Sequence, residues 1–207
     1  MWNSQVIIML LEGIRDTLYM TLASTLFGYI IGLPMGIVLT VTDKDGIRPN
    51  AAVYKVLDVI SNLLRSIPFI ILLIVLIPFT RFVVGRSYGS TATIVPLTIA
   101  AAPYIARMVE SSLKEVDAGV IEAARSMGAS DFQIVTKVML VEARTSLIVG
   151  ATISLGTILG YSAMAGTVGG GGLGDIAIRY GYTRWQTDIM VVTVVLLVIL
   201  FQIFPTI

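Results

Sequence analysis

The sequence predicts an all-helical membrane protein with five transmembrane helices and one polar insert. Of its 207 residues, 56% are hydrophobic and only 13% are charged, whereas soluble domains usually carry about 25% charged residues. The mean hydropathy of +0.91 points to the same class of protein. One polar, amphipathic stretch, "EAARSMGASDFQIVTKVM" (122–139), separates the long apolar runs on either side of it.

Five apolar runs are judged against the roughly 20 helical residues needed to cross a bilayer. Prolines inside the second and third runs are tolerable because neighbouring helices can satisfy the freed carbonyls. Residues 6–16 are too few to cross, and we expect them to lie along the interface as a separate amphipathic helix. The chain is thus one transmembrane domain, 1–207, with spans at about 18–41, 57–79, 91–109, 146–165 and 186–204.

Five spans place the termini on opposite sides of the membrane. Apart from Arg65, which lies in the second span, the basic residues divide eight to five between the two faces, and the positive-inside rule assigns the richer face to the cytoplasm. This predicts an external N-terminus, a cytoplasmic C-terminus and a cytoplasmic polar insert. The richer face holds Lys44, Arg48, Lys55, Arg107, Lys114, Arg125, Lys137 and Arg144, and the other holds Arg15, Arg81, Arg86, Arg179 and Arg184.

Composition also excludes several kinds of chemistry. The chain has no Cys and no His, which removes disulfides, thiol catalysis, imidazole bases and the usual zinc sites. A net charge of +1 gives no basic surface for nucleic acid. We therefore expect no metal, no cofactor and no nucleic-acid partner.

The polar insert, about 117–140, is predicted to be a helix, a tight turn and a second helix. Asp117 can cap a helix that begins at Ala118. Gly128 suits the position after that helix, where φ is positive. Ser130 and Gln133 have the spacing of a capping box, so a second helix is expected to start at once.

The insert resembles the EAA loop of permease subunits in ATP-binding-cassette importers. That pattern runs Glu-Ala-Ala, three residues, Gly, and after nine more residues Ile-x-Leu-Pro. Val138 replaces the Ile conservatively, and Val141 stands where Pro is usual. The matching residues are Glu122, Ala123, Ala124, Gly128 and Leu140.

Three further stretches resemble the methionine-importer branch of these permeases: "LRSIPFIILL" (64–73), "IVPLTIAAAPYIARMVE" (94–110) and "GYSAMAGTVGGGGLGD" (160–175). The resemblance covers nearly the whole chain. It implies a type I importer permease in the bacterial inner membrane, which moves D- or L-methionine into the cytoplasm by alternating access. Another amino acid carried by the same superfamily is the alternative substrate.

The resemblance also implies partners. Two cytoplasmic ATPase subunits and an external substrate-binding protein accompany such permeases, with lipid around the spans. Five helices are too few to enclose an amino-acid-sized passage, so we expect a homodimer with the passage between the copies. The residues implied to dock the ATPase are Glu122, Ala123, Ala124, Arg125, Ser126, Met127 and Gly128.

The glycine run "GGGGLGD" (169–175) suggests two other functions. No G-x-x-x-x-G-K-[ST] motif is present, so it is not a phosphate loop, and the chain is not expected to hydrolyse ATP itself. "GLGD" also matches the G-x-G-D pattern of intramembrane aspartyl proteases, which would need a second nearby carboxylate. Asp58 is the only other Asp expected within the membrane.

Three residues near the outer end of the fourth span are candidates to line or gate the passage: Tyr161, Ser162 and Met164. A ring, a hydroxyl and a thioether suit a methionine zwitterion, although Met and Tyr in a span are usually packing residues. Asp58 and Arg65 lie on about the same helical face. Either they form a polar stripe that faces the passage, or the Arg65 side chain extends toward the cytoplasmic headgroups. Arg107 and Glu110 are expected to form a weak interfacial pair.

Overall fold

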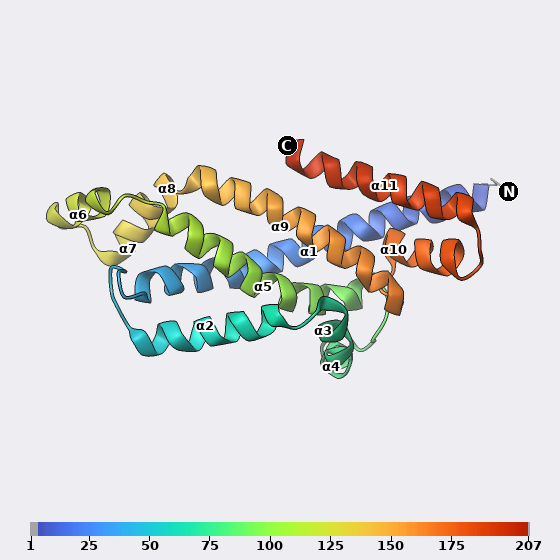
Figure 1. The fold of residues 1–207 in the computed structure, drawn as a ribbon, viewed down its shortest axis with the longest axis horizontal. Helices are drawn as coiled ribbons and strands as arrows, with labels where there is room; N and C mark the ends of the chain where they lie inside the picture. The colour runs from blue at the N-terminus through green and yellow to red at the C-terminus, as the bar shows by residue number, and fades with distance from the viewer. Residues whose placement is uncertain (1–3, 207) are drawn as a thin grey trace. The chain divides into compact units, whose positions relative to one another are not determined.

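A computed structural model of the chain describes residues 4–206, and every regular element within that range is helical. Figure 1 shows the ribbon. The α-helices are α1 (Ser4–Thr42), α2 (Ala51–Ser66), α3 (Phe69–Val75), α4 (Ile77–Val84), α5 (Ser90–Lys114), α6 (Ala118–Ser126), α7 (Asp131–Gln133), α8 (Leu140–Glu142), α9 (Arg144–Ala165), α10 (Gly172–Ile176) and α11 (Thr187–Thr206). Two π-helical segments, η1 (Ile134–Met139) and η3 (Ala177–Tyr182), and a 3-10 turn, η2 (Gly166–Val168), complete the chain.

Four helices in the described range are long and apolar enough to cross a membrane: Ser4–Thr42, Ser90–Lys114, Arg144–Tyr182 and Thr187–Phe204. A fifth span results if α2 and α3 are counted together. The chain breaks between them at Pro68, whose ψ of 134° is extended rather than helical. Proline fixes its own φ and has no amide hydrogen to continue a helix, so the second predicted span consists of shorter helices.

The first helix differs from the prediction. Residues 6–16 were expected to form a separate interfacial helix, but they continue without interruption into α1. No proline or other break separates Asp16 from the apolar run. At the junction the buried Thr17 hydroxyl donates to the carbonyl of Gly13 in the preceding turn, a bond that leaves the helix unbroken here.

The chain divides into two compact units. Unit 1 contains residues 1–27, 67–100 and 155–207, and unit 2 contains residues 28–66 and 101–154. The long helices α1, α5 and α9 contribute to both units.

The core of unit 1 is apolar and includes Leu173 of the glycine-rich stretch 169–175. Its buried members are Leu10, Leu159, Leu173, Ile176, Ile189 and Leu200. Gly169, Gly171 and Gly172 have positive φ values of 77°, 83° and 74°, which turn the chain tightly into α10. The Thr17 hydroxyl accepts the amide hydrogen of Leu173 at 2.9 Å and so fixes the start of α10 on α1.

The core of unit 2 is built on a glycine stripe of α1, made of Gly28, Gly32 and Gly36. These lie four residues apart on one face, against α5. A Cβ on Gly32 would come within 2.6 Å of the Ala102 carbonyl oxygen, and one on Gly36 within 2.6 Å of the Ala106 carbonyl oxygen. The two helix backbones therefore pack in direct contact, as small residues at four-residue spacing allow in membranes.

Candidate functional site

The polar insert has the helix–turn–helix form that the sequence predicts. The Asp117 side chain accepts the amide hydrogen of Gly119 at 2.8 Å and caps α6. Gly128 has a φ of +83°, and Ser130 with Gln133 forms a complete capping box at the start of α7. Figure 1 shows α6 and α7 as a short pair next to the C-terminal end of α5. Local hydrogen bonds thus cap the starts of both helices, and the turn between them has a defined backbone conformation.

The proposed docking residues lie mostly on the surface of α6. Glu122, Ala123, Arg125, Ser126, Met127 and Gly128 are exposed, with Met127 at 82%, and only Ala124 is buried. Helix α6 packs on η1, where Ile134 is fully buried. The Arg125 guanidinium donates to the Ile47 carbonyl at 2.8 Å, so α6 is joined to the loop between α1 and α2. The exposed residues leave one face of the helix open for a partner.

The candidate passage residues have different environments. The Tyr161 ring stacks on Phe69 of α3, with centroids 4.7 Å apart and planes inclined by 5°. Ser162 is buried and donates to the Leu159 carbonyl of its own helix at 2.8 Å, so its hydroxyl is not presented to an open surface. Met164 is 46% exposed. Met164 is thus the most exposed of the three side chains, Tyr161 is half-buried and Ser162 is buried.

The two carboxylates of the protease alternative are each paired with an arginine. Asp175 bonds Arg179 at 2.7 Å, one turn along the chain. Asp58 is ion-paired with Arg107. An aspartyl dyad instead needs two carboxylates close enough to share a proton. These ion pairs argue against a proteolytic site.

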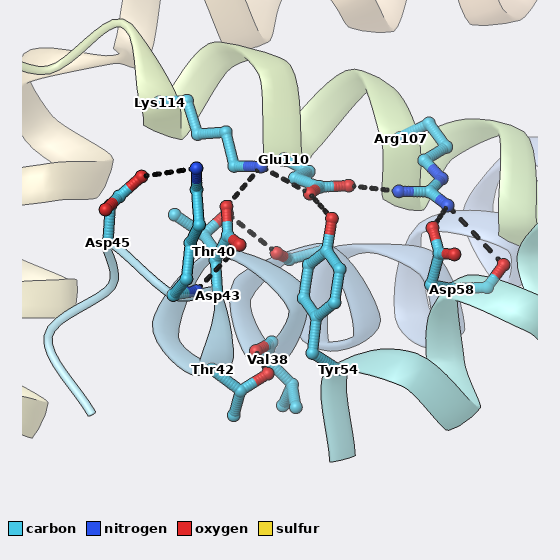
Figure 2. A network of polar contacts seen from close by, with 12 residues as sticks. Val38, Thr40, Thr42, Asp43, Asp45, Tyr54, Asp58, Arg107, Glu110 and Lys114 are labelled. Atoms are coloured by element: carbon cyan, nitrogen blue, oxygen red, sulfur yellow. Dashed lines mark hydrogen bonds and ion pairs between the residues drawn. The ribbon is translucent and has the colours of Figure 1, made fainter. Parts of the chain in front are cut away.

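A polar cluster ties together the helix ends beside the insert. It consists of Asp43, Tyr54, Asp58, Asn62, Arg107, Glu110 and Lys114, which come from α2, α5 and the loop after α1. Figure 2 shows Glu110 at its centre, between Arg107 and Lys114 on the same helix, with the Tyr54 phenol pointing at it from α2.

Glu110 is the most deeply buried charge of the cluster, with its side chain 6% exposed. Its Oε2 accepts from the Arg107 guanidinium at 2.7 Å. Its Oε1 accepts from Lys114 Nζ at 2.8 Å and from the Tyr54 hydroxyl at 3.2 Å. Three donors compensate the lost hydration of the carboxylate, whereas a buried ion left without its partner costs about 3–5 kcal/mol.

The two cations extend the cluster to the neighbouring segments. Arg107 reaches across to α2, where it bonds the Asp58 carboxylate and, at 3.1 Å, the Asn62 side-chain oxygen. Lys114 reaches the loop after α1 and bonds Asp43 at 2.7 Å. The hydrogen bond from Lys114 holds the pKa of the Asp43 carboxyl below its ordinary value of 3.8, so Asp43 is ionised at neutral pH.

This cluster bears on two expectations. Arg107 and Glu110 form the expected contact between neighbouring turns, with Glu110 buried and Arg107 partly buried, and Lys114 and Tyr54 add further bonds to Glu110. Asp58 pairs with Arg107 on another helix, and Arg65 is exposed in the last turn of α2. The Asp58–Arg107 pair could not be read from one helix, because its members lie about 50 residues apart in the chain.

The glycine stripe is a second feature that sequence reasoning missed, although its signal was present. Gly28, Gly32 and Gly36 repeat at the small-xxx-small spacing. The corresponding pair in α9, Gly156 and Gly160, does not make a paired contact. Gly156 faces the Phe201 ring, and a Cβ on Gly160 would meet nothing within 4 Å.

Comparison with known proteins matches this architecture over nearly the whole chain. The family model of binding-protein-dependent transport system inner membrane components matches residues 18–207. The probable D-methionine transport system permease protein MetI of Vibrio cholerae is 48% identical over 199 residues, which cover 96% of this chain and 88% of that one. The D-methionine transport system permease protein MetI of Escherichia coli is 54% identical over 158 residues, covering 76% and 73%.

Solved structures agree. The chain is similar to one in a structure of inward-facing conformations of the MetNI methionine ABC transporter, with a TM-score of 0.97 and 50% identity over 99% of this chain and 95% of that chain. An amino acid ABC transporter crystallised with histidines is 20% identical with a TM-score of 0.79, which shows the shared fold. The chain belongs to the family of binding-protein-dependent transport system inner membrane components.

Proposed function

We propose that this chain is the permease subunit of an ATP-driven importer that carries methionine across the bacterial inner membrane into the cytoplasm. The observation that carries the proposal is the match, at 50% identity over 99% of the chain, to a chain of a methionine ABC transporter. Relatives named as D-methionine permeases support the same substrate. The chain itself has no nucleotide-binding motif, so a partner ATPase supplies the energy.

The polar insert is the part that receives that energy. Its capped helix α6 presents Glu122, Ala123, Ser126 and Met127 on an open surface, flanked by Arg125 and Gly128. Such a short helix, fixed at both ends, transmits a displacement better than a mobile loop. Closure of two ATPase subunits on ATP moves two docked inserts, and the spans alternate between outward and inward access.

The assembly contains a second copy of the chain, two ATPase subunits and an external substrate-binding protein, within membrane lipid. The excess of basic residues around the insert supports a cytoplasmic insert, an external N-terminus and a cytoplasmic C-terminus. The passage lies between the copies. Tyr161 and Met164 contact methionine there through a ring and a thioether, which attract a polarizable side chain. Ser162, which is buried and bonded to the Leu159 carbonyl, acts as a packing residue of α9.

The decisive experiment measures uptake of radiolabelled methionine by proteoliposomes that contain the chain with its ATPase and binding protein. ATP-dependent uptake that unlabelled D- or L-methionine suppresses is the expected result. Suppression by a different amino acid alone would identify another substrate of the same superfamily. No ATP-dependent uptake of any amino acid would reject the proposal.

Docking is tested by reversing one charge on α6. Glu122→Lys is expected to release the ATPase, because an exposed carboxylate on the docking face becomes a repulsive cation. The measurement is the ratio of ATPase to permease after affinity purification in detergent. Glu142→Lys, which changes another exposed Glu in α8 outside the insert, is the control. Full ATPase recovery with Glu122→Lys would refute the docking face.

A further inference from the structure

Within one copy, α2 is attached to its neighbours by charge more than by apolar packing. Ser61 is the only buried residue among its 16. Its polar side chains Tyr54, Asp58 and Asn62 all bond to residues of α5. Helix α1, by contrast, packs on α5 through the close glycine stripe. The position of α2 therefore depends on the polar cluster.

Glu110 organises that cluster because it holds both cations at once. Arg107 and Lys114 flank it on α5, one turn to either side, and each uses its remaining donors to reach another segment. Arg107 reaches Asp58 on α2, and Lys114 reaches Asp43 after α1. If Glu110 lost its charge, Arg107 and Lys114 would lose the ion pairs that orient their side chains.

The cluster continues into the insert through the loop between α1 and α2. Lys114 holds the start of this loop at Asp43, and Arg125 of α6 holds its middle at the Ile47 carbonyl. Backbone hydrogen bonds from Arg48 to Val41, at 3.0 Å, and from Asn50 to Thr42, at 2.9 Å, stiffen the loop. A continuous set of polar contacts thus runs from α6 to α2.

Charged contacts of this kind resist sliding. Charge-assisted hydrogen bonds need donor–acceptor distances near 2.7–2.9 Å, and little water reaches Glu110 to replace a broken one. Apolar surfaces keep their attraction when they shift, because burial has no direction. The cluster therefore favours joint movement of α2, the loop and α5 over relative sliding.

We propose that Glu110 is a positioning residue for transport, which makes α2, the α1–α2 loop and the end of α5 move as one body with the insert. The inference rests on the proposed function, because it takes α6 to be the element that the ATPase displaces. It adds a requirement: the displacement reaches α2 only while the Glu110 contacts hold.

The first test measures distances directly. The chain has no native Cys, so Lys55→Cys on α2 and Ser111→Cys on α5, both at exposed positions, can carry a pair of spin labels. Labelled chain is diluted with unlabelled chain in the complete importer. We expect the same distance without nucleotide and with ATP plus vanadate, and a changed or broadened one in Glu110→Gln. A distance that shifts between the states in the otherwise unchanged chain would overturn the proposal.

The second test measures methionine taken up per ATP hydrolysed. Glu110→Gln keeps the shape but removes the charge, and we expect ATPase recovery and hydrolysis to persist while this ratio falls about tenfold or more. Asp43→Asn removes one outer contact and lowers the ratio less. Asp45→Asn is the matched control, because its carboxylate on the same loop makes only an exposed 3.7 Å pair with Lys44.

The outcomes separate this inference from the proposed function. An unchanged importer that takes up no methionine would refute the proposed function. Uptake by the unchanged importer, with the ratio of Glu110→Gln equal to that of Asp45→Asn, would refute the role of Glu110 alone. If Glu110→Gln fails to assemble, Asp43→Asn decides: a lowered ratio supports the proposal and an unchanged ratio overturns it.

Discussion

At the scale of single residues, the smallest side chains and a buried charge set the packing of unit 2. Gly32 and Gly36 let the backbone of α1 touch α5, and Glu110 joins α5 to the polar side chains around it. Both kinds of contact are intolerant of change. A methyl group has no room against a carbonyl oxygen, and a buried carboxylate needs its donors.

Gly32→Ala is expected to destabilise the protein by about 1–3 kcal/mol, the usual cost of overpacking. The new methyl carbon would lie 2.6 Å from the Ala102 carbonyl oxygen and 2.9 Å from Ile105 Cβ. The measurement is the midpoint of thermal unfolding of the purified importer in detergent. Gly150→Ala is the matched control, since its methyl would make an ordinary 3.5 Å contact with Met108. Equal midpoints for the two variants would contradict the close packing.

At the scale of elements, helix α6 of the insert depends on the hydrogen bonds at its two ends. Helix α6 has only nine residues, too few to be stable by propensity alone. Asp117 caps its start, and its end is closed by hydrogen bonds from Met127 and Gly128 to carbonyls of the last turn. The corner depends on the positive φ of Gly128, which side chains other than Asn and Asp adopt only at a cost.

Replacements at Gly128 test whether docking of the ATPase needs the positive φ of the turn or the absence of a side chain. Gly128→Val forces a β-branched residue into a left-handed conformation, so we expect the corner to distort and the ATPase to dissociate. Gly128→Asn tolerates the same φ and is expected to retain most of the ATPase. Co-purification of ATPase with each variant is the readout. Equal loss in both would mean that the partner needs the bare glycine surface rather than the turn.

At the scale of the whole molecule, the question is which source of energy drives transport through the permease. Carriers driven by ion gradients usually hold ionisable groups near the middle of the membrane for the coupling ion. The buried carboxylate of Glu110 is bonded to Arg107, Lys114 and Tyr54. Asp58 and Asp175 are each paired with an arginine. These pairings agree with the family of the chain, whose relatives are permease components of ABC importers.

The purified chain alone is expected to move no methionine into vesicles, whether a proton gradient, a sodium gradient or ATP is supplied. Addition of the ATPase and the binding protein should make uptake depend on ATP and leave it indifferent to both gradients. Radiolabelled methionine retained on filters is the measurement, with protein-free vesicles as the blank. Gradient-driven uptake by the chain alone would contradict a partner-driven permease.

Features that depend on neighbours in the chain were predictable. Asp117, Gly128, Ser130 and Gln133 specify caps and a turn through bonds to atoms at most five residues away, and the structure confirms them. The apolar runs predicted the helices, although the ends differ. Residues 6–16 join α1, because nothing in the sequence interrupts the helix there, while the run near Pro68 divides into separate helices.

Contacts between distant segments were not predictable in the same way. Glu110, read from its own helix, offers only Arg107 and Lys114 as partners. Tyr54 and Asp58 lie about 50 residues away, and nothing in one sequence states which faces of α2 and α5 meet. The environments of Tyr161 and Ser162 were equally hidden, because stacking on Phe69 and burial depend on packing.

Hydropathy and local hydrogen-bond chemistry in the sequence alone determined a helical membrane protein with a capped polar hairpin and no nucleotide site of its own. The tertiary structure alone decided that Glu110 is a buried junction and that α1 lies directly on α5. The physical reason is the range of the interactions. Caps and spans follow from a few consecutive residues, whereas a buried ion network forms only when folding brings its members together.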